Sequence, residues 1–147
     1  MAMTPNIGLP YLSTAQAQKE LTHNEALVLI DAVLMGLVEE AGADVPPSSP
    51  SIGQCWIVGQ NPEDAWEDQA QKLAIWTEGG WRFIVPKKNM YRRRSDDGTI
   101  LLFDGIEWHL PPEILQADGG SVVDVEARSV MVQLLQLLEG HGVLKMA

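Results

Sequence analysis

Apolar side chains recur at helical spacing between Thr22 and Ala41. Thr22, with Glu25 three residues later, forms a capping box that marks the start of a helix. A heptad-like seam follows at 3-4-3-4 spacing, made of Leu27, Ile30, Leu34, Leu37 and Ala41. The other side is mostly apolar too, with Asp31 and Gly36 as interruptions. Because a helix that is apolar nearly all round has to be covered on more than one face, we expect this one at the core of an oligomer. A helix buried within its own monomer is the alternative.

The stretch before this helix predicts an extended arm. Residues 5–12 contain two prolines and one glycine, so we expect a non-helical segment. Its apolar side chains, which we expect to be buried, are Ile7, Leu9, Tyr11 and Leu12. Ser13 and Gln16 form a second candidate capping box and predict a short helix that breaks near Thr22. Gly42 is the predicted end of the long helix.

A linker rich in proline and serine, residues 43–51, separates this helical region from a β-rich middle. In the middle, short runs of strand-forming residues alternate with turn residues. The predicted strands are Cys55–Val58, Leu73–Thr77, Trp81–Val85, Met90–Arg92, Thr99–Phe103 and Ile106–Leu110. We therefore predict a small antiparallel β module over residues 52–120, whose strand order the sequence leaves open.

Two stretches of this module resemble each other at an offset of 27 residues, the distance from Trp81 to Trp108. In each stretch an aromatic residue ends one run, a turn containing glycine follows, and a tryptophan begins the return. The aromatic residues before the two turns are Trp76 and Phe103. The pattern predicts two similar hairpins whose aromatic rings pair across the strands.

A second apolar helix follows the β module. Ser121 or Asp124 is its predicted N-cap, and Gly140 and Gly142 are its predicted end. Its seam at 4-3-4 spacing consists of Ala127, Met131, Leu134 and Leu138. We expect this helix to pack back on the N-terminal one.

The predicted fold class is α+β, organised as an intertwined oligomer. Residues 1–42 form the arm and the oligomerisation helices, and residues 121–147 form the C-terminal helix. The linker of residues 43–51 and the β module of residues 52–120 lie between them. The predicted interface positions are Leu27, Ile30, Leu34 and Leu37 on the first helix, and Met131, Leu134 and Leu138 on the second.

The charge balance narrows the range of partners. The chain of 147 residues carries 20 acidic and 10 basic residues, a formal net charge of −10. Because phosphate contacts need clustered Lys and Arg, we do not expect a nucleic-acid binder. The single cysteine, Cys55, allows neither an intrachain disulfide nor a thiolate metal cluster. The N-terminus has no secretory signal and no apolar run is long enough for a membrane span, so we expect a soluble protein made in the cytoplasm.

The β-rich middle contains all five tryptophans, which are candidates for stacking on sugar rings. Alternation along the strands favours a place in the core for most of them. Trp66 is the best candidate for an exposed ring, because it lies in a polar loop rather than on a predicted strand. Trp76 and Trp81 are the other candidates for contact with a glycan.

Basic residues cluster around Tyr91, and Arg92, Arg93 and Arg94 are candidate anion contacts. The alternative is a charged strand edge, or a patch that pairs with acidic residues of the same oligomer. The histidines match no metal-ligand spacing, and the chain has no nucleophile elbow, phosphate loop or dinucleotide fingerprint. The acidic residues that a glycosidase would need occur at turn-like positions. We therefore predict no catalytic residue, no metal site and no cofactor.

The run from Asn6 to Leu27, NIGLPYLSTAQAQKELTHNEAL, resembles the signature of a phage protein family of unknown function. Members of that family occur in prophages and gene transfer agents, mostly of proteobacteria. The likeness continues in PPSSPSIGQCWIVG, around Trp76–Trp81, and in Phe103-Asp104-Gly105 with Trp108. The run that starts at Val123 resembles the ends of phage structural proteins.

The resemblance implies a virion structural protein of a tail fibre, a spike or a baseplate, made in the bacterial cytoplasm and carried in a phage or phage-like particle. It implies a homotrimer that contacts other particle proteins, and it assigns no catalytic residue. Some members have long C-terminal extensions that would hold a receptor-binding or enzymatic head. This chain stops at Ala147, so we expect no such head. The rival interpretation is a carbohydrate-binding module that recognises a host surface glycan through exposed tryptophans, and a glycan hydrolase is a third.

Overall fold

The computed structural model describes residues 2–12, 19–111, 113–114 and 124–146. Its first helix, α1, spans Lys19–Met35 and ends before the predicted Ala41. Gly36 ends it, because its φ of +69° lies in the left-handed region that glycine adopts without steric cost. The predicted helical extent to Ala41 is therefore wrong.

Two short parallel strands occupy the segment that the pattern assigned to the end of the helix. β1, Leu37–Val38, pairs with β6, Met90–Arg94. β2, Ala41–Ala43, pairs with β3, Cys55–Val58. The hydrogen bonds gained in these ladders override the helical spacing of the side chains. Leu37 consequently lies half-buried in β1 rather than on a helical seam, which corrects its predicted position.

The start of α1 differs from the prediction as well. The helix runs without a break through Thr22, so the predicted capping box is wrong. The carboxylate of Glu25 forms an ion pair with Arg82 and accepts a hydrogen bond of 3.2 Å from the hydroxyl of Thr77. Thr77 and Arg82 belong to the hairpin of β4, Leu73–Thr77, and β5, Gly80–Ile84. The candidate capping box at Ser13 and Gln16 lies outside the described residues.

The α+β fold class is confirmed, with two small sheets that are mixed rather than purely antiparallel. The first sheet has the order β2-β3-β4-β5, and the second has the order β1-β6-β7-β8. The remaining strands of these sheets are β3 Cys55–Val58, β4 Leu73–Thr77, β5 Gly80–Ile84, β6 Met90–Arg94, β7 Ile100–Phe103 and β8 Trp108–His109. A separate parallel pair consists of β9, Glu113–Ile114, and β10, Lys145–Met146. A short 3-10 turn, η1, spans Asp64–Trp66 between β3 and β4.

The two predicted aromatic hairpins are confirmed. Trp76 pairs with Trp81 across β4 and β5, and their ring centroids lie 5.0 Å apart. Phe103 pairs with Trp108 across β7 and β8, at a ring distance of 5.2 Å. The repeat in the sequence therefore reflects one hairpin design, used once in each sheet.

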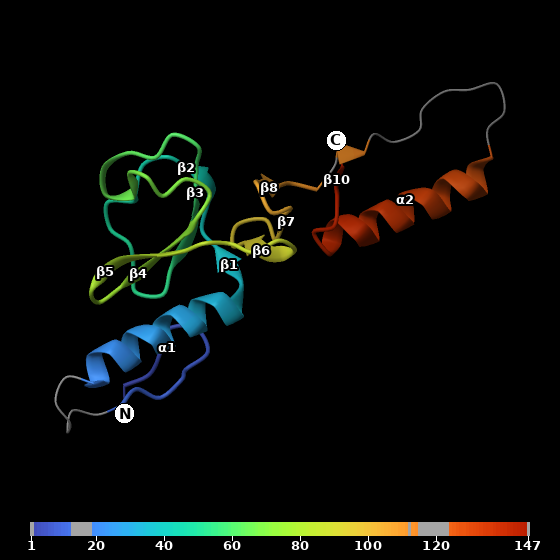
Figure 1. Ribbon diagram of the computed structural model, residues 1–147. Coiled ribbons are helices and arrows are strands. Elements are labelled where there is room, and N and C mark those ends of the chain that lie inside the picture. Colours follow the sequence, from blue (N-terminus) through green and yellow to red (C-terminus); the bar gives the residue numbers. More distant parts are fainter. Residues whose placement is uncertain (1, 13–18, 112, 115–123, 147) are drawn as a thin grey trace.

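The strand β3 of the first sheet is buried on both faces, because all four of its residues are buried and successive residues point to opposite sides. On one side, a core cluster joins α1 and both sheets through Ala32, Val38, Cys55, Ile57, Leu73, Ile75 and Leu101. On the other side, a second cluster consists of Trp56, Val58, Trp66 and Ala74. The helix α1 lies against β4 below the first sheet (Figure 1).

The N-terminal arm is non-helical, as predicted, but a polar contact holds it on α1. The Asp31 carboxylate is fully buried, and its Oδ1 accepts hydrogen bonds from the Thr4 hydroxyl at 2.7 Å and from the Ile7 amide at 2.8 Å. Its Oδ2 accepts one from the Asn6 amide at 2.8 Å. Ile7 and Leu12 are 46% and 51% exposed, so the predicted burial of these two side chains is wrong.

The second helix, α2, spans Val125–Gly140. The carboxylate of Asp124 caps it by accepting a hydrogen bond of 2.8 Å from the Ala127 amide, while the alternative cap Ser121 lies outside the described residues. Figure 1 shows α2 on the far side of the second sheet from α1, projecting from the body. Within one chain, α2 therefore does not pack back on α1 as predicted.

Candidate interaction surfaces

The outer face of α1 is apolar and uncovered in the single chain. Val28, Asp31 and Ala32 form the buried face of the helix. Ile30 and Leu34, one turn apart on another face, are 48% and 66% exposed. Leu27 lies half-buried between the two faces. Three of the four predicted interface positions of α1 therefore belong to the helix, and two of them are largely open to solvent.

The helix α2 exposes an entire apolar stripe. None of its residues from Val125 to Gly140, all of which are described, is buried. The large apolar side chains of the stripe that are more than half exposed are Val130 (64%), Met131 (60%), Leu134 (53%) and Leu137 (58%). Leu138 is half-buried. An isolated helix of this length is marginal in water, and its stability in a protein comes from packing an apolar face. The stripe is therefore the surface of the described chain that most needs a partner.

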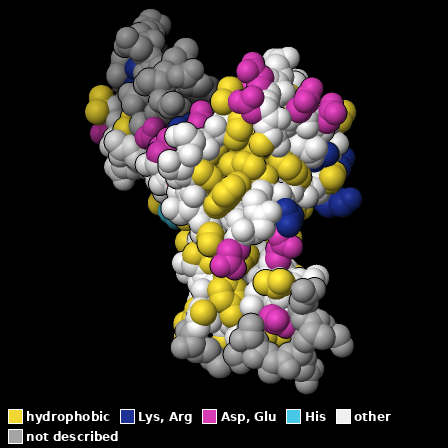
Figure 2. Space-filling model, turned by 90° about the vertical axis from the view of Figure 1, so that its left-hand side faces the viewer, with side chains coloured by type: hydrophobic (Ala, Val, Ile, Leu, Met, Phe, Trp, Pro, Cys, Tyr) yellow, Lys and Arg dark blue, Asp and Glu magenta, His cyan; other side chains and the backbone are white. Residues whose placement is uncertain are grey.

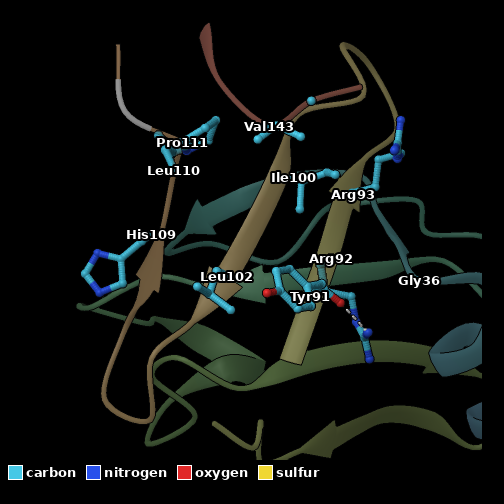
Figure 3. A pocket seen from close by; sticks show the side chains of 11 residues that line it. Gly36, Tyr91, Arg92, Arg93, Ile100, Leu102, His109, Leu110, Pro111 and Val143 are labelled. Atoms are coloured by element: carbon cyan, nitrogen blue, oxygen red, sulfur yellow. Dashed lines mark hydrogen bonds between the residues drawn. The ribbon is translucent and has the colours of Figure 1, made fainter. Parts of the chain in front are cut away.

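A groove of about 700 Å³ lies on the second sheet, on the face turned away from the core. Tyr91 pairs with Leu102 and Arg93 with Ile100, so these four side chains share that face. His109, opposite Leu102, extends the face onto β8 (Figure 3). The remaining lining residues are Gly36, Arg92, Leu110, Pro111, Gly142 and Val143. We call this surface the outer groove.

The outer groove is apolar with basic groups and no carboxylate among its described lining residues. Tyr91, Leu110 and Val143 are 57%, 60% and 52% exposed, so much of its apolar surface faces water. Arg93, the Tyr91 hydroxyl and His109 supply its polar groups, and the Nε2 of His109 lies 2.8 Å from the Asp104 carboxylate. A surface of this kind fits an apolar segment that carries negative charge.

Residues 23–109 match the family model described as "Protein of unknown function (DUF2793)". The chain belongs to this family. The comparison with curated proteins returned no match. The matched segment of the family runs from the first part of α1 to the end of β8, and thus contains the outer face of α1 and both four-stranded sheets. The stripe of α2 lies outside the family match.

The tryptophans form a packed cluster rather than an open platform. Trp66 is completely buried, so its predicted exposure is wrong. Its ring centroid lies 5.1 Å from that of Trp81 and 6.4 Å from that of Trp56, because η1 folds the polar loop back over the first sheet. Trp76 and Trp81 remain half-buried. Figure 2, which looks onto the side where β5 lies, shows hydrophobic side chains gathered at the centre of this side of the body.

The three candidate anion-binding arginines are separated by the alternation of β6, an inner strand of its sheet. Arg92 points to the core, is 6% exposed and donates to the carbonyl of Tyr91 at 2.7 Å. Arg93 is exposed on the outer face. Arg94 pairs with Asp96, whose pKa falls to about 2 mainly through the hydrogen bond from Arg94. The described structure thus does not unite them in a single anion site.

Other site chemistry is limited in the described part of the chain. No group of three or more His, Cys, Asp or Glu side chains there has the arrangement of a metal site. Neither helix among those residues is long and apolar enough to cross a membrane. Sequence reasoning missed both the outer groove and the buried Asp31. The single acidic residue in an otherwise apolar helix face was the available signal for Asp31, whereas the groove depends on a strand register that the sequence leaves open.

Proposed function

We propose that the protein is a structural component of a phage or phage-like particle, in a tail fibre, a spike or a baseplate-associated part. It acts there as a homo-oligomer, and we propose a trimer. The observation that carries the proposal is the apolar stripe of α2, centred on Met131, Leu134 and Leu138, none of which is buried within the single chain. The phage assignment itself rests on the resemblance of the N-terminal signature and of the C-terminal run to phage proteins.

The physical argument for assembly is the cost of leaving these surfaces in water. Burying one leucine or methionine side chain contributes roughly 1.5–3 kcal/mol. The outer face of α1 and the stripe of α2 together leave several such side chains more than half exposed, among them Leu34 and Leu134. Contact between copies removes this surface from water, and it gives the helix α2 the packing that it lacks within one chain.

Substitutions on the two helices test the proposal. Ile30→Asp, Leu34→Asp and Leu134→Asp each place a charge in an interface, so we expect them to lower the molar mass measured by light scattering after size exclusion. Ile106→Asp is the matched control, because Ile106 is 81% exposed at the tip of the β7–β8 hairpin, outside both helices. Native-size assemblies in all four variants would contradict an assembly role for the helices.

A second candidate function is recognition of a host surface glycan. The observation in its favour is the pair of half-buried rings of Trp76 and Trp81, which remain partly open to solvent on the first sheet. Host polysaccharide would then quench tryptophan fluorescence, and Trp76→Ala would abolish the quenching while the far-UV circular dichroism stays native. Absence of quenching in the wild-type protein would exclude this function, and turnover of the polysaccharide would instead reveal a hydrolase.

A further inference from the structure

We propose that α2 of one copy lies in the outer groove of a neighbouring copy. This inference rests on the proposed homo-oligomer and specifies which surfaces meet in it. Each chain carries one apolar helix with no buried residue among its described positions and one apolar groove that is open to solvent. Both surfaces are removed from water when α2 of every copy binds in the groove of a neighbour and the groove of every copy holds the α2 of another.

The helix α2 cannot reach its own groove, because its C-terminal end is fixed at the rim of that groove. The carbonyl of Gly142 accepts a hydrogen bond of 3.1 Å from the Ile100 amide on β7. The amides of Gly142 and Val143 donate back to the last turn of α2, at 2.8 and 2.9 Å. Gly142 has a φ of +70°, and a Cβ there would lie only 2.4 Å from the carbonyl oxygen of Gly98. This tight turn directs α2 away from the sheet (Figure 1).

The groove and the helix are complementary in charge. Among its described lining residues the groove has Arg93 and no carboxylate, while the Nε2 of His109 at its edge is already paired with the Asp104 carboxylate at 2.8 Å. The segment from Asp124 to Gly140 carries three carboxylates and one arginine. In α1, the competing site, the three acidic residues Glu20, Glu25 and Asp31 outnumber the single lysine, Lys19. Charge therefore favours the groove over α1 as the site for α2.

The two surfaces also fit in shape. The floor of the groove is formed by side chains of neighbouring strands, Tyr91, Ile100 and Leu102, and a helix that packs its apolar stripe on one face of a sheet is a common two-layer arrangement. A helix of 16 residues is about 24 Å long, enough to cross β6 and β7, the two strands that form the floor. When the rotation between copies allows closure, exchange of this kind gives a closed assembly such as a twofold dimer or a cyclic trimer.

Cysteine cross-linking tests the inference directly in the full chain. The native Cys55 does not interfere, because burial raises the pKa of its thiol to about 12. A chain with Tyr91→Cys and Leu134→Cys joins the exposed floor of the groove to the middle of the stripe. With a short bismaleimide, we expect this variant to form covalent species up to the size of the native oligomer on a denaturing gel.

Control variants separate the alternatives. Leu134→Cys alone cross-links only if α2 helices meet each other. Ile30→Cys with Leu134→Cys, compared with Ile30→Cys alone, gains a cross-link only if α2 meets α1 or another α2. We expect no cross-link in Leu134→Cys alone and no gain over Ile30→Cys alone in the double variant. Such a cross-link or such a gain would overturn the inference, as would the absence of a cross-link in the variant with Tyr91→Cys. If the variant with Tyr91→Cys and Leu134→Cys has the mass of the native oligomer but does not cross-link, the groove assignment alone is wrong. If the wild-type protein is a monomer, the proposed assembly is wrong as well.

Discussion

At the scale of single residues, Asp31 organises the N-terminal part of the fold. It is the only charged residue in the described chain below 1% exposure, and three hydrogen bonds from Thr4, Asn6 and Ile7 satisfy its carboxylate. In the sequence it stands out as an interruption of an apolar helix. The structure shows instead that it connects the N-terminal arm to α1.

We predict that Asp31→Asn destabilises the protein by about 3 kcal/mol, since an amide nitrogen would face donors in a buried site. The arm should detach from α1, so limited proteolysis should cut faster within residues 2–12. Chemical denaturation should show the lower free energy of unfolding. Asn24→Ala is the matched control. Asn24 also ties the arm to α1, through two hydrogen bonds with Leu12, but those bonds are exposed, so we expect a loss of about 1 kcal/mol or less.

The contribution of Asp31 should depend on pH. Burial raises the pKa of a carboxyl group, but here the hydrogen bonds from Ile7, Thr4 and Asn6 outweigh it, so the pKa of Asp31 lies below its usual value. The stability it supplies is complete above the unfolded-state pKa of about 3.9 and is lost as the pH falls through the folded-state value. The difference in unfolding free energy between wild type and Asp31→Asn should shrink over that range, and a constant difference would argue against the ionised carboxylate as its source.

Arg92 presents the opposite case, a buried charge that is poorly satisfied. Its Nε and one terminal nitrogen have no hydrogen-bond partner in the described structure. We predict that Arg92→Met leaves the stability unchanged or raises it by up to about 2 kcal/mol, because a buried charge without full pairing is costly. Arg93→Met on the exposed face should change it by less than about 0.5 kcal/mol. A large loss of stability in Arg92→Met would mean that the guanidinium has an acceptor in the assembled protein.

At the scale of elements, the hairpins could be predicted and the end of the first helix could not. The pairs Trp76–Trp81 and Phe103–Trp108 follow from local turn and aromatic signals, so the sequence located both hairpins correctly. The end of α1 depends on long-range pairing of β1 with β6, which no local pattern reveals. For the same reason the outer groove, whose floor is set by the register of β6 and β7, was missed.

We predict that Gly36→Ala costs about 1 kcal/mol, because an L residue is strained at a φ of +69°. Nothing lies closer than 4.0 Å to the added Cβ, so this loss would measure backbone strain alone. Gly140→Ala, inside α2 and also in open space, should instead stabilise its helix by up to about 1 kcal/mol. Thermal unfolding of both variants tests the pair, and a stabilising effect of Gly36→Ala would show that the helix continues beyond Met35.

At the scale of the whole molecule, the fold leaves apolar surface uncovered in three places. The core clusters use the inner face of α1 and both faces of the first sheet. The outer face of α1, the outer groove and the stripe of α2 remain open to solvent in a single chain. We expect α1 to be covered on more than one face. Within the monomer only its inner face is covered, so we propose that other copies of the chain cover its outer face.

The mass of the wild-type protein in solution tests this claim most directly. Light scattering coupled to size exclusion, over a hundredfold range of concentration, should give three times the 16.1 kDa of one chain. That result would agree with the proposed contacts between copies. A mass of 16.1 kDa at every concentration would contradict them, and a freestanding binding module would then be the better account of the protein.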